Sequence, residues 1–358
     1  MSSVHALMTV KPQARDVAWL KEALTCAIKL EHATIPPYFC AYWSIKARGH
    51  PFRAILKGVV LEEMGHMGLA ANMLAALGGS PPIGDPGFVP TYPGPLPCGI
   101  VPRAKPNLVV ALQRFSVDLV RDVFMNIEYP ENEPVPIERT ALARNGNAPA
   151  TTTYHSIGAF YEAIRAAFEG LDPVPYFDPA HQLAYPIGGN PHNMVFPVQS
   201  VADAIRAIDQ IREQGEGTPG SPDAEDFGME LAHYYQFEQI SVGVMFVPIG
   251  GGKWKQGMKY PPLTEAHIWP MAAIPPGGYS GPGVPAEVGQ FNVKYQAMLA
   301  NLKLAWAQGG TAGLTTLSNA VSQMNDLEDL AIAAMQIPIG AGPETYGPTF
   351  QMGGAATP

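Results

Sequence analysis

Apolar residues recur every three or four positions in separate windows of this chain, which is the spacing that places them on one face of an α-helix. The windows are 15–34, 52–77, 107–128, 153–169, 201–213, 226–247, 286–308 and 312–336. We expect the first helix to end or kink at Pro36 and Pro37, because proline lacks a backbone donor and clashes with the preceding turn. The pattern predicts a mainly α-helical protein.

Glycine and proline, 37 residues each, are concentrated between these windows. The stretches rich in these two residues are 78–106, 129–150, 172–199, 215–223 and 248–285. We expect the last of them to hold short strands or to wrap the helices. We therefore predict two parts. Residues 14–247 form a metal-binding helix bundle with long loops, and residues 248–358 form an extension with a helical hairpin packed on that bundle.

Charge and cysteine content narrow the class of protein. The net charge is −9 with 22 Lys plus Arg and no basic run, so we expect neither nucleic acid nor a membrane surface as a partner. No stretch reaches the roughly 18 apolar residues of a membrane span, and the start lacks the features of a signal peptide. Cys26, Cys40 and Cys98 show no CxxC spacing, which fits a reducing compartment. We expect a soluble, cytoplasmic protein.

Acidic and imidazole side chains fall on helix faces that ought to be apolar. Glu63 and His66 form one Glu-x-x-His pair, Glu230 and His233 form another, and Glu31 lies on the buried stripe of the first window. Residues three apart share a helix face, so each pair can converge on one ion. A buried unpaired carboxylate costs on the order of several kcal/mol, which bound cations would offset.

Helix bundles that hold two metal ions use a Glu from each of two helices and a Glu-x-x-His from each of the other two. The residues above supply five of these six groups. Three carboxylates compete for the sixth place. Glu128 aligns with its apolar stripe but at a helix end, Glu162 lies in mid-helix on a less apolar face, and Glu216 follows an apolar stripe between glycines.

The remaining polar and aromatic residues have simpler interpretations. Glu62 is interpreted as a solvated neighbour, and His32 as a polar or outer partner of the metal site. His155, His181 and His192 have no helical partner and are interpreted as structural. Aromatic residues are interpreted as core, or as the wall of a pocket that stacks an aromatic substrate: Tyr38, Tyr42, Trp43, Tyr161, Tyr234 and Tyr235.

Six strings of this sequence resemble, in order, the ferritin-like domain of the iminophenyl-pyruvate dimer synthase family, whose members act in violacein and rebeccamycin-type pathways. They are LTCAIKLEHATIPPYFCAYWSI, LEEMGHMGLAANMLAALGGSPPI, PTYPGPLP, SIGAFYEAI, IREQGEG and ELAHYYQFEQI, within residues 14–247. The resemblance implies a ferritin-like bundle with a carboxylate and histidine metal site. As metal ligands it supports Glu31, Glu63, His66 and His233, and it makes Glu128 and Glu216 further candidates. The candidates Glu162 and Glu230 rest on helical spacing instead.

The function that we predict is oxidation of a small, aromatic or other amino-acid-derived substrate by a non-haem centre. The cofactor would be iron, as two ions, with manganese as the alternative metal. The partners would be that substrate and dioxygen or peroxide, in a chain that could form a homo-oligomer. The family's pathway enzymes are about three times longer, so their coupling reaction is not carried over. The alternative functions are an iron-storage or ferroxidase protein without an organic substrate, and a redox-inactive relic.

Overall fold

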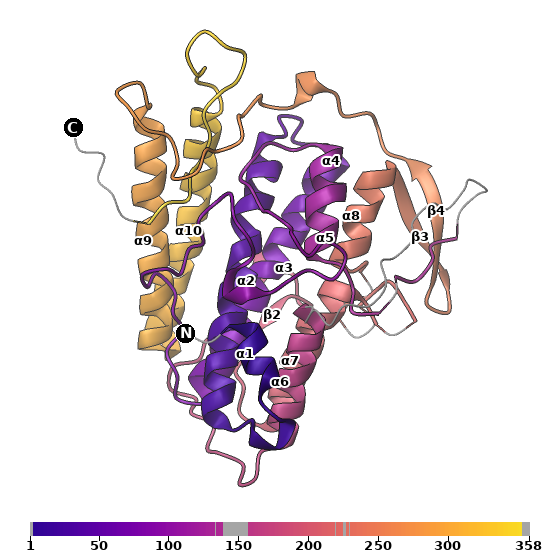
Figure 1. The fold of residues 1–358 in the computed structure, drawn as a ribbon, viewed down its shortest axis with the longest axis vertical. Coiled ribbons are helices and arrows are strands. Elements are labelled where there is room, and N and C mark those ends of the chain that lie inside the picture. Colours follow the sequence, from indigo (N-terminus) through magenta and orange to yellow (C-terminus); the bar gives the residue numbers. More distant parts are fainter. Residues whose placement is uncertain are drawn as a thin grey trace.

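The computed structural model describes residues 3–132, 134–138, 157–218, 220–224, 227–228 and 230–352. The described residues are mainly helical, which confirms the predicted fold class (Figure 1). The helices are α1 Val4–Thr9, α2 Val17–Ser44, α3 Pro51–Ala76, α4 Val117–Leu119, α5 Met125–Ile127, α6 Ile157–Glu169, α7 Val201–Glu216, α8 His233–Val242, α9 Ala286–Gln308 and α10 Gly310–Ala334. In the described part of the chain, two short antiparallel strand pairs accompany them, β1 Tyr185–Pro186 with β2 Met194–Val195, and β3 Val244–Gly250 with β4 Lys253–Lys259.

The helix α2 does not end at Pro36 and Pro37, which was one of the two outcomes that we expected there, but runs through both prolines to Ser44. Pro37 cannot donate to the carbonyl of Ala33, four residues earlier. The Tyr92 hydroxyl donates to that carbonyl instead, at 2.7 Å. The helix is also buried along most of its length. Tertiary packing therefore outweighs the local preference of the two prolines.

The predicted helix over 107–128 begins only at Val117, after the Ser116 side chain caps the Leu119 amide. Before it, Leu108, Val110 and Leu112 are buried in alternation, which is the period of an extended segment. A π-helical turn, Val120–Phe124, joins α4 to α5. Such turns are frequent at functional sites, and Glu128 directly follows this one's short C-terminal helix.

The helix predicted over residues 226–247 is also shorter in the structure. The helix α8 begins at His233 and ends at Val242, and the left-handed conformation of the next residue, Gly243, closes it. Strand β3 follows at once from Val244, within a stretch rich in β-branched and aromatic residues. We expected short strands or a wrapping segment from Pro248 onward. The first strand instead starts at Val244, four residues before this proline.

The helices α2 and α3 form the centre of the molecule (Figure 1). The hairpin of α9 and α10 lies along one side of this pair, and α8 with the β3–β4 hairpin lies on the other. Side chains of the extension and of the bundle share one continuous core, in which the Trp43 and Phe291 rings meet edge to face. Among the described residues, no helix has the length and apolar content that crossing a membrane requires.

Candidate metal centre

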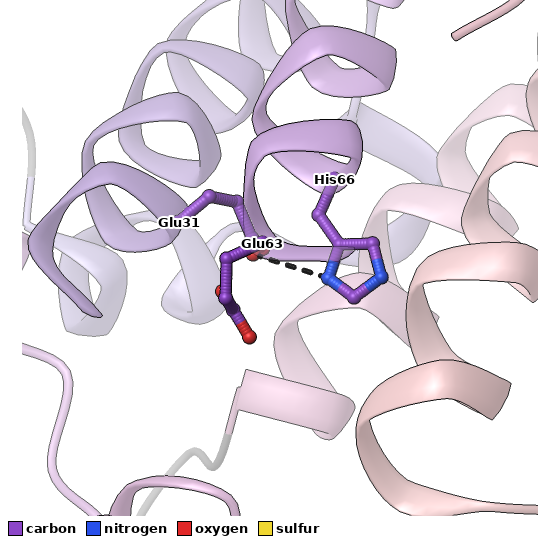
Figure 2. A group of neighbouring side chains, drawn as sticks. All are labelled: Glu31, Glu63 and His66. Atoms are coloured by element: carbon purple, nitrogen blue, oxygen red, sulfur yellow. Dashed lines mark ion pairs between the residues drawn. The ribbon is translucent and has the colours of Figure 1, made fainter. Parts of the chain in front are cut away.

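Three buried side chains from α2 and α3 meet in the interior: Glu31, Glu63 and His66 (Figure 2). Each offers one donor atom, and these atoms all lie within 4.8 Å of one another. His66 Nδ1 is 3.6 Å from Glu31 Oε2. The i, i+3 spacing of Glu63 and His66 places both on one face of α3, as the sequence predicted, and the structure shows that α2 packs against this face.

A second group shares Glu63 with the first and adds Glu128 and His233. Glu128 ends the short helix α5, and His233 is the first residue of α8. His233 Nδ1 lies 2.8 Å from Glu63 Oε1 and 3.5 Å from Glu128 Oε2. Within the described part of the chain, two overlapping groups of possible metal ligands are therefore joined by one carboxylate.

Both histidines direct Nδ1 toward the carboxylates and are held at Nε2 by another side chain. His66 Nε2 lies 2.9 Å from Gln214 Oε1, and His233 Nε2 lies 2.9 Å from Glu62 Oε2. These oxygens accept hydrogen bonds, so in a neutral ring Nε2 carries the proton and Nδ1 keeps its lone pair. Metal-binding histidines in proteins usually have an outer partner of this kind.

Hydroxyl groups fix the three carboxylates. Tyr161 donates to Glu31 Oε1, and Tyr38 donates to Glu128 Oε1. Thr34 Oγ1 is 2.9 Å from Glu63 Oε2. Burial, and then the neighbouring carboxylates, raise the pKa of both phenols well above the ordinary value, so they stay protonated donors. Each carboxylate keeps an oxygen for a metal ion.

The electrostatics of this cluster suit cations. Burial and then the charge of Glu128 raise the pKa of Glu63 to about 7. His233 Nδ1 is buried without a hydrogen bond of ordinary geometry to any described residue, although two carboxylates lie near it. Oxygen and imidazole donors together suit first-row divalent metals. The residues present therefore fit a pair of such ions.

Glu216, at the end of α7, is a neighbour of the two groups. It lines the same cavity of about 40 Å³ as Glu31, Glu63 and Glu128. Its Oε2 accepts the backbone N–H of Glu131 at 3.1 Å, and burial raises the pKa of its carboxyl to about 7. A Cβ at Gly158 of α6 would lie 1.9 Å from Glu216 Oε1. The glycine thus makes room for this carboxylate.

Replacing Gly158 by alanine is therefore expected to push Glu216 from its place. Overpacking of this kind costs about 1–3 kcal/mol in the free energy of unfolding, which denaturant titration would measure. The matched control is Gly289→Ala in α9, where nothing lies within 4 Å of the added Cβ. There the substitution should be neutral or stabilising, by up to about 1 kcal/mol. Equal stabilities of the two variants would contradict the close approach at Gly158.

Two residues that the sequence predicted as metal ligands, Glu162 and Glu230, belong to neither ligand group. Glu162 is exposed on α6, where its Oε2 accepts from Arg212 at 2.6 Å. Glu230 is also exposed and precedes α8, so it does not share a helix face with His233. The interpretation of Glu230 and His233 as a helical Glu-x-x-His pair is therefore wrong, because the helix begins at the histidine itself.

Glu62 was wrongly interpreted as solvated, since it is buried against His233. Its position beside Glu63 on the face of α3 that α8 approaches was not visible in the sequence pattern. Gln214 was not singled out, because a neutral amide gives no signal. His32 bonds Tyr295 instead of a group of the centre, His181 and His192 are exposed outside both groups, and His155 lies outside the described residues.

A protein-family model described as "Ferritin-like" matches residues 24–242. The crystal structure of a ferritin-like protein from Caulobacter vibrioides superposes with a TM-score of 0.59 and 22% sequence identity. The match covers 92% of this chain and 97% of that chain, and at this identity it shows a shared fold. Comparison with curated proteins gave no match.

Proposed function

Because this chain belongs to the ferritin-like family, we propose that it is a non-haem oxidoreductase with two iron ions, which the two ligand groups that share Glu63 would hold. The observation that carries the proposal is the pair of overlapping groups that share this carboxylate. One ion would be held by Glu31, Glu63 and His66. The other would be held by Glu63, Glu128 and His233.

The charge balance supports two ions instead of one. Among the described residues, four buried or nearly buried carboxylates line the cavity, Glu31, Glu63, Glu128 and Glu216, whereas the buried Glu62 is paired with His233. Two divalent ions carry the four positive charges that would neutralise them. A single ion would leave a net negative charge in a site that water barely reaches, which is costly.

When bound, ferrous iron supplies electrons to dioxygen or peroxide. The protein's own side chains have other tasks in this proposal. Tyr38 and Tyr161 orient the outer carboxylates through hydrogen bonds, and Gln214 and Glu62 fix the histidine rings. Apolar neighbours such as Leu30 and Ile127 limit access of water to the cavity.

An organic substrate is favoured over storage by a second cavity beside the first. This cavity has a volume of about 260 Å³ and shares Arg212 and Glu216 with the metal cavity. Buried Arg212 Nε has no hydrogen-bond partner among the described residues, so it could meet a substrate carboxylate. We therefore propose a small, amino-acid-derived substrate, and the resemblance noted in the sequence favours an aromatic one.

The test is anaerobic loading with ferrous iron followed by exposure to oxygen, monitored by optical absorption. We expect two ferrous ions per chain, rapid oxidation, and return to the ferrous state when a reductant is supplied. Uptake of many more ferric ions per chain would favour the storage alternative instead. Failure to bind iron, with no gain in thermal stability on its addition, would contradict both functions.

A further inference from the structure

A larger cavity, of about 300 Å³, lies between the central helices and the α9–α10 hairpin. Neighbouring residues of α2 and α3 divide between this cavity and the metal centre. Glu31 and Glu63 belong to the metal centre, whereas His32 and Met64 line the cavity. The two sites are thus on different faces of the same two helices.

The wall of this cavity is apolar and rich in aromatic rings. It includes Phe39, Trp43, Tyr295, Trp306 and Phe350. Protein interiors are close packed and rarely leave voids much larger than a water molecule. An apolar cavity of about 150 Å³ already binds benzene, so this one has room for a molecule of two fused rings. Methionine side chains in the wall, such as Met64 and Met324, can adapt to such a guest.

Two nitrogen atoms of the lining residues lack a hydrogen-bond partner among the described residues, Trp43 Nε1 and His32 Nδ1. His32 is only 3% exposed, and its Nε2 lies 2.6 Å from the Tyr295 hydroxyl. The Tyr295 hydroxyl has no other hydrogen-bond acceptor among the described residues, so we assign its proton to His32 Nε2, which leaves a ring proton on Nδ1. That Nδ1 has no hydrogen-bond partner among the described residues.

A buried donor without an acceptor is costly, and a ligand oxygen would satisfy it. We propose that the cavity between α2, α3, α9 and α10 is a second binding site, which takes a neutral, flat, apolar molecule with one hydrogen-bond acceptor that meets His32 Nδ1. The exposed residues Lys57 and Asn325 mark the wall's outer end, where such a molecule would enter. This site needs no metal, so it stands independently of the proposed oxidation.

The test uses the fluorescent naphthyl ketone 6-propionyl-2-dimethylaminonaphthalene, which is neutral and carries one carbonyl acceptor. The full chain, with and without metal, should bind one molecule in the micromolar range with a blue shift of its emission. Filling the cavity with Val321→Trp in α10, or with Val60→Phe in α3, should weaken binding by more than about tenfold, because either ring would occupy the guest's volume. The matched control is Val293→Trp on α9, at a position 68% exposed, which should bind normally.

The polar contact has its own variant. His32→Phe keeps a ring of similar size but removes the donor, so it should weaken binding of the ketone about tenfold, the size of one hydrogen bond. Binding of N-phenyl-1-naphthylamine, which lacks the carbonyl, should change little. Three outcomes would overturn the proposal: no saturable binding, equal binding by the filled variants that fold, or displacement by dodecanoate but not by 2-acetonaphthone, which would assign the cavity to an acyl chain.

Discussion

Replacing Glu63 by alanine is expected to remove both metal ions at once. Glu63 belongs to both ligand groups, and its two oxygens face the Thr34 hydroxyl and His233 Nδ1. Loss of an outer partner already costs 10–100-fold in metal affinity, so loss of a shared ligand should cost more than about a hundredfold at each position. Metal content after dialysis and calorimetric titration with cobalt(II) would measure this.

The matched control is Glu162→Ala, which removes an exposed carboxylate that the sequence had also offered as a ligand. That variant should keep two ions per chain. A folding defect can be separated from a binding defect with Glu63→Gln. Since a buried charge is unfavourable without its cation, metal-free Glu63→Gln should be at least as stable as the metal-free parent. Two tightly bound ions in Glu63→Ala would refute the shared-ligand arrangement.

Removing the outer hydrogen-bond partner of one histidine is expected to lower the affinity for one metal ion and to leave the affinity for the other unchanged. Glu62→Ala leaves His233 Nε2 without its acceptor, so the ring loses its fixed orientation. We expect a 10–100-fold lower affinity for the ion beside Glu128. Titration should then change from two similar binding events to one strong and one weak event.

The corresponding variant for the other histidine, Gln214→Ala, should lower the affinity for the ion beside Glu31, because Gln214 holds His66 Nε2. The double variant should weaken both ions. If either single variant lowered the two affinities equally, or lowered neither, the assignment of one outer partner to each ion would be wrong.

Local patterns in the sequence were sufficient for the long helices. The face of α3 that carries Glu63 and His66, and the bounds of α9, followed from apolar spacing alone. Apolar spacing predicted the wrong structure where the helical period and the alternating period of a strand both fitted the sequence, and it placed the start of one helix too early. Leu108, Val110 and Leu112 were taken into a helix although they alternate, and Glu230 was placed in a helix that begins three residues later.

The outer contacts of the centre depend on packing between distant segments, which local spacing cannot report. Tyr38 reaches a carboxylate 90 residues away, and Tyr161 reaches one 130 residues away. Both tyrosines were interpreted as core or pocket-wall aromatics because nothing local reveals where a hydroxyl will find its acceptor. Glu62 was misjudged for the same reason, since its burial depends on α8.

The most direct test of the central claim is X-ray diffraction from crystals of the iron-loaded protein, recorded on both sides of the iron absorption edge. The account predicts two anomalous peaks about 3.5–4 Å apart, the usual spacing of two-metal sites. Glu63 should lie between them, with His66 at one peak and His233 at the other. A single peak, or peaks at Glu162 or Glu230, would contradict the account.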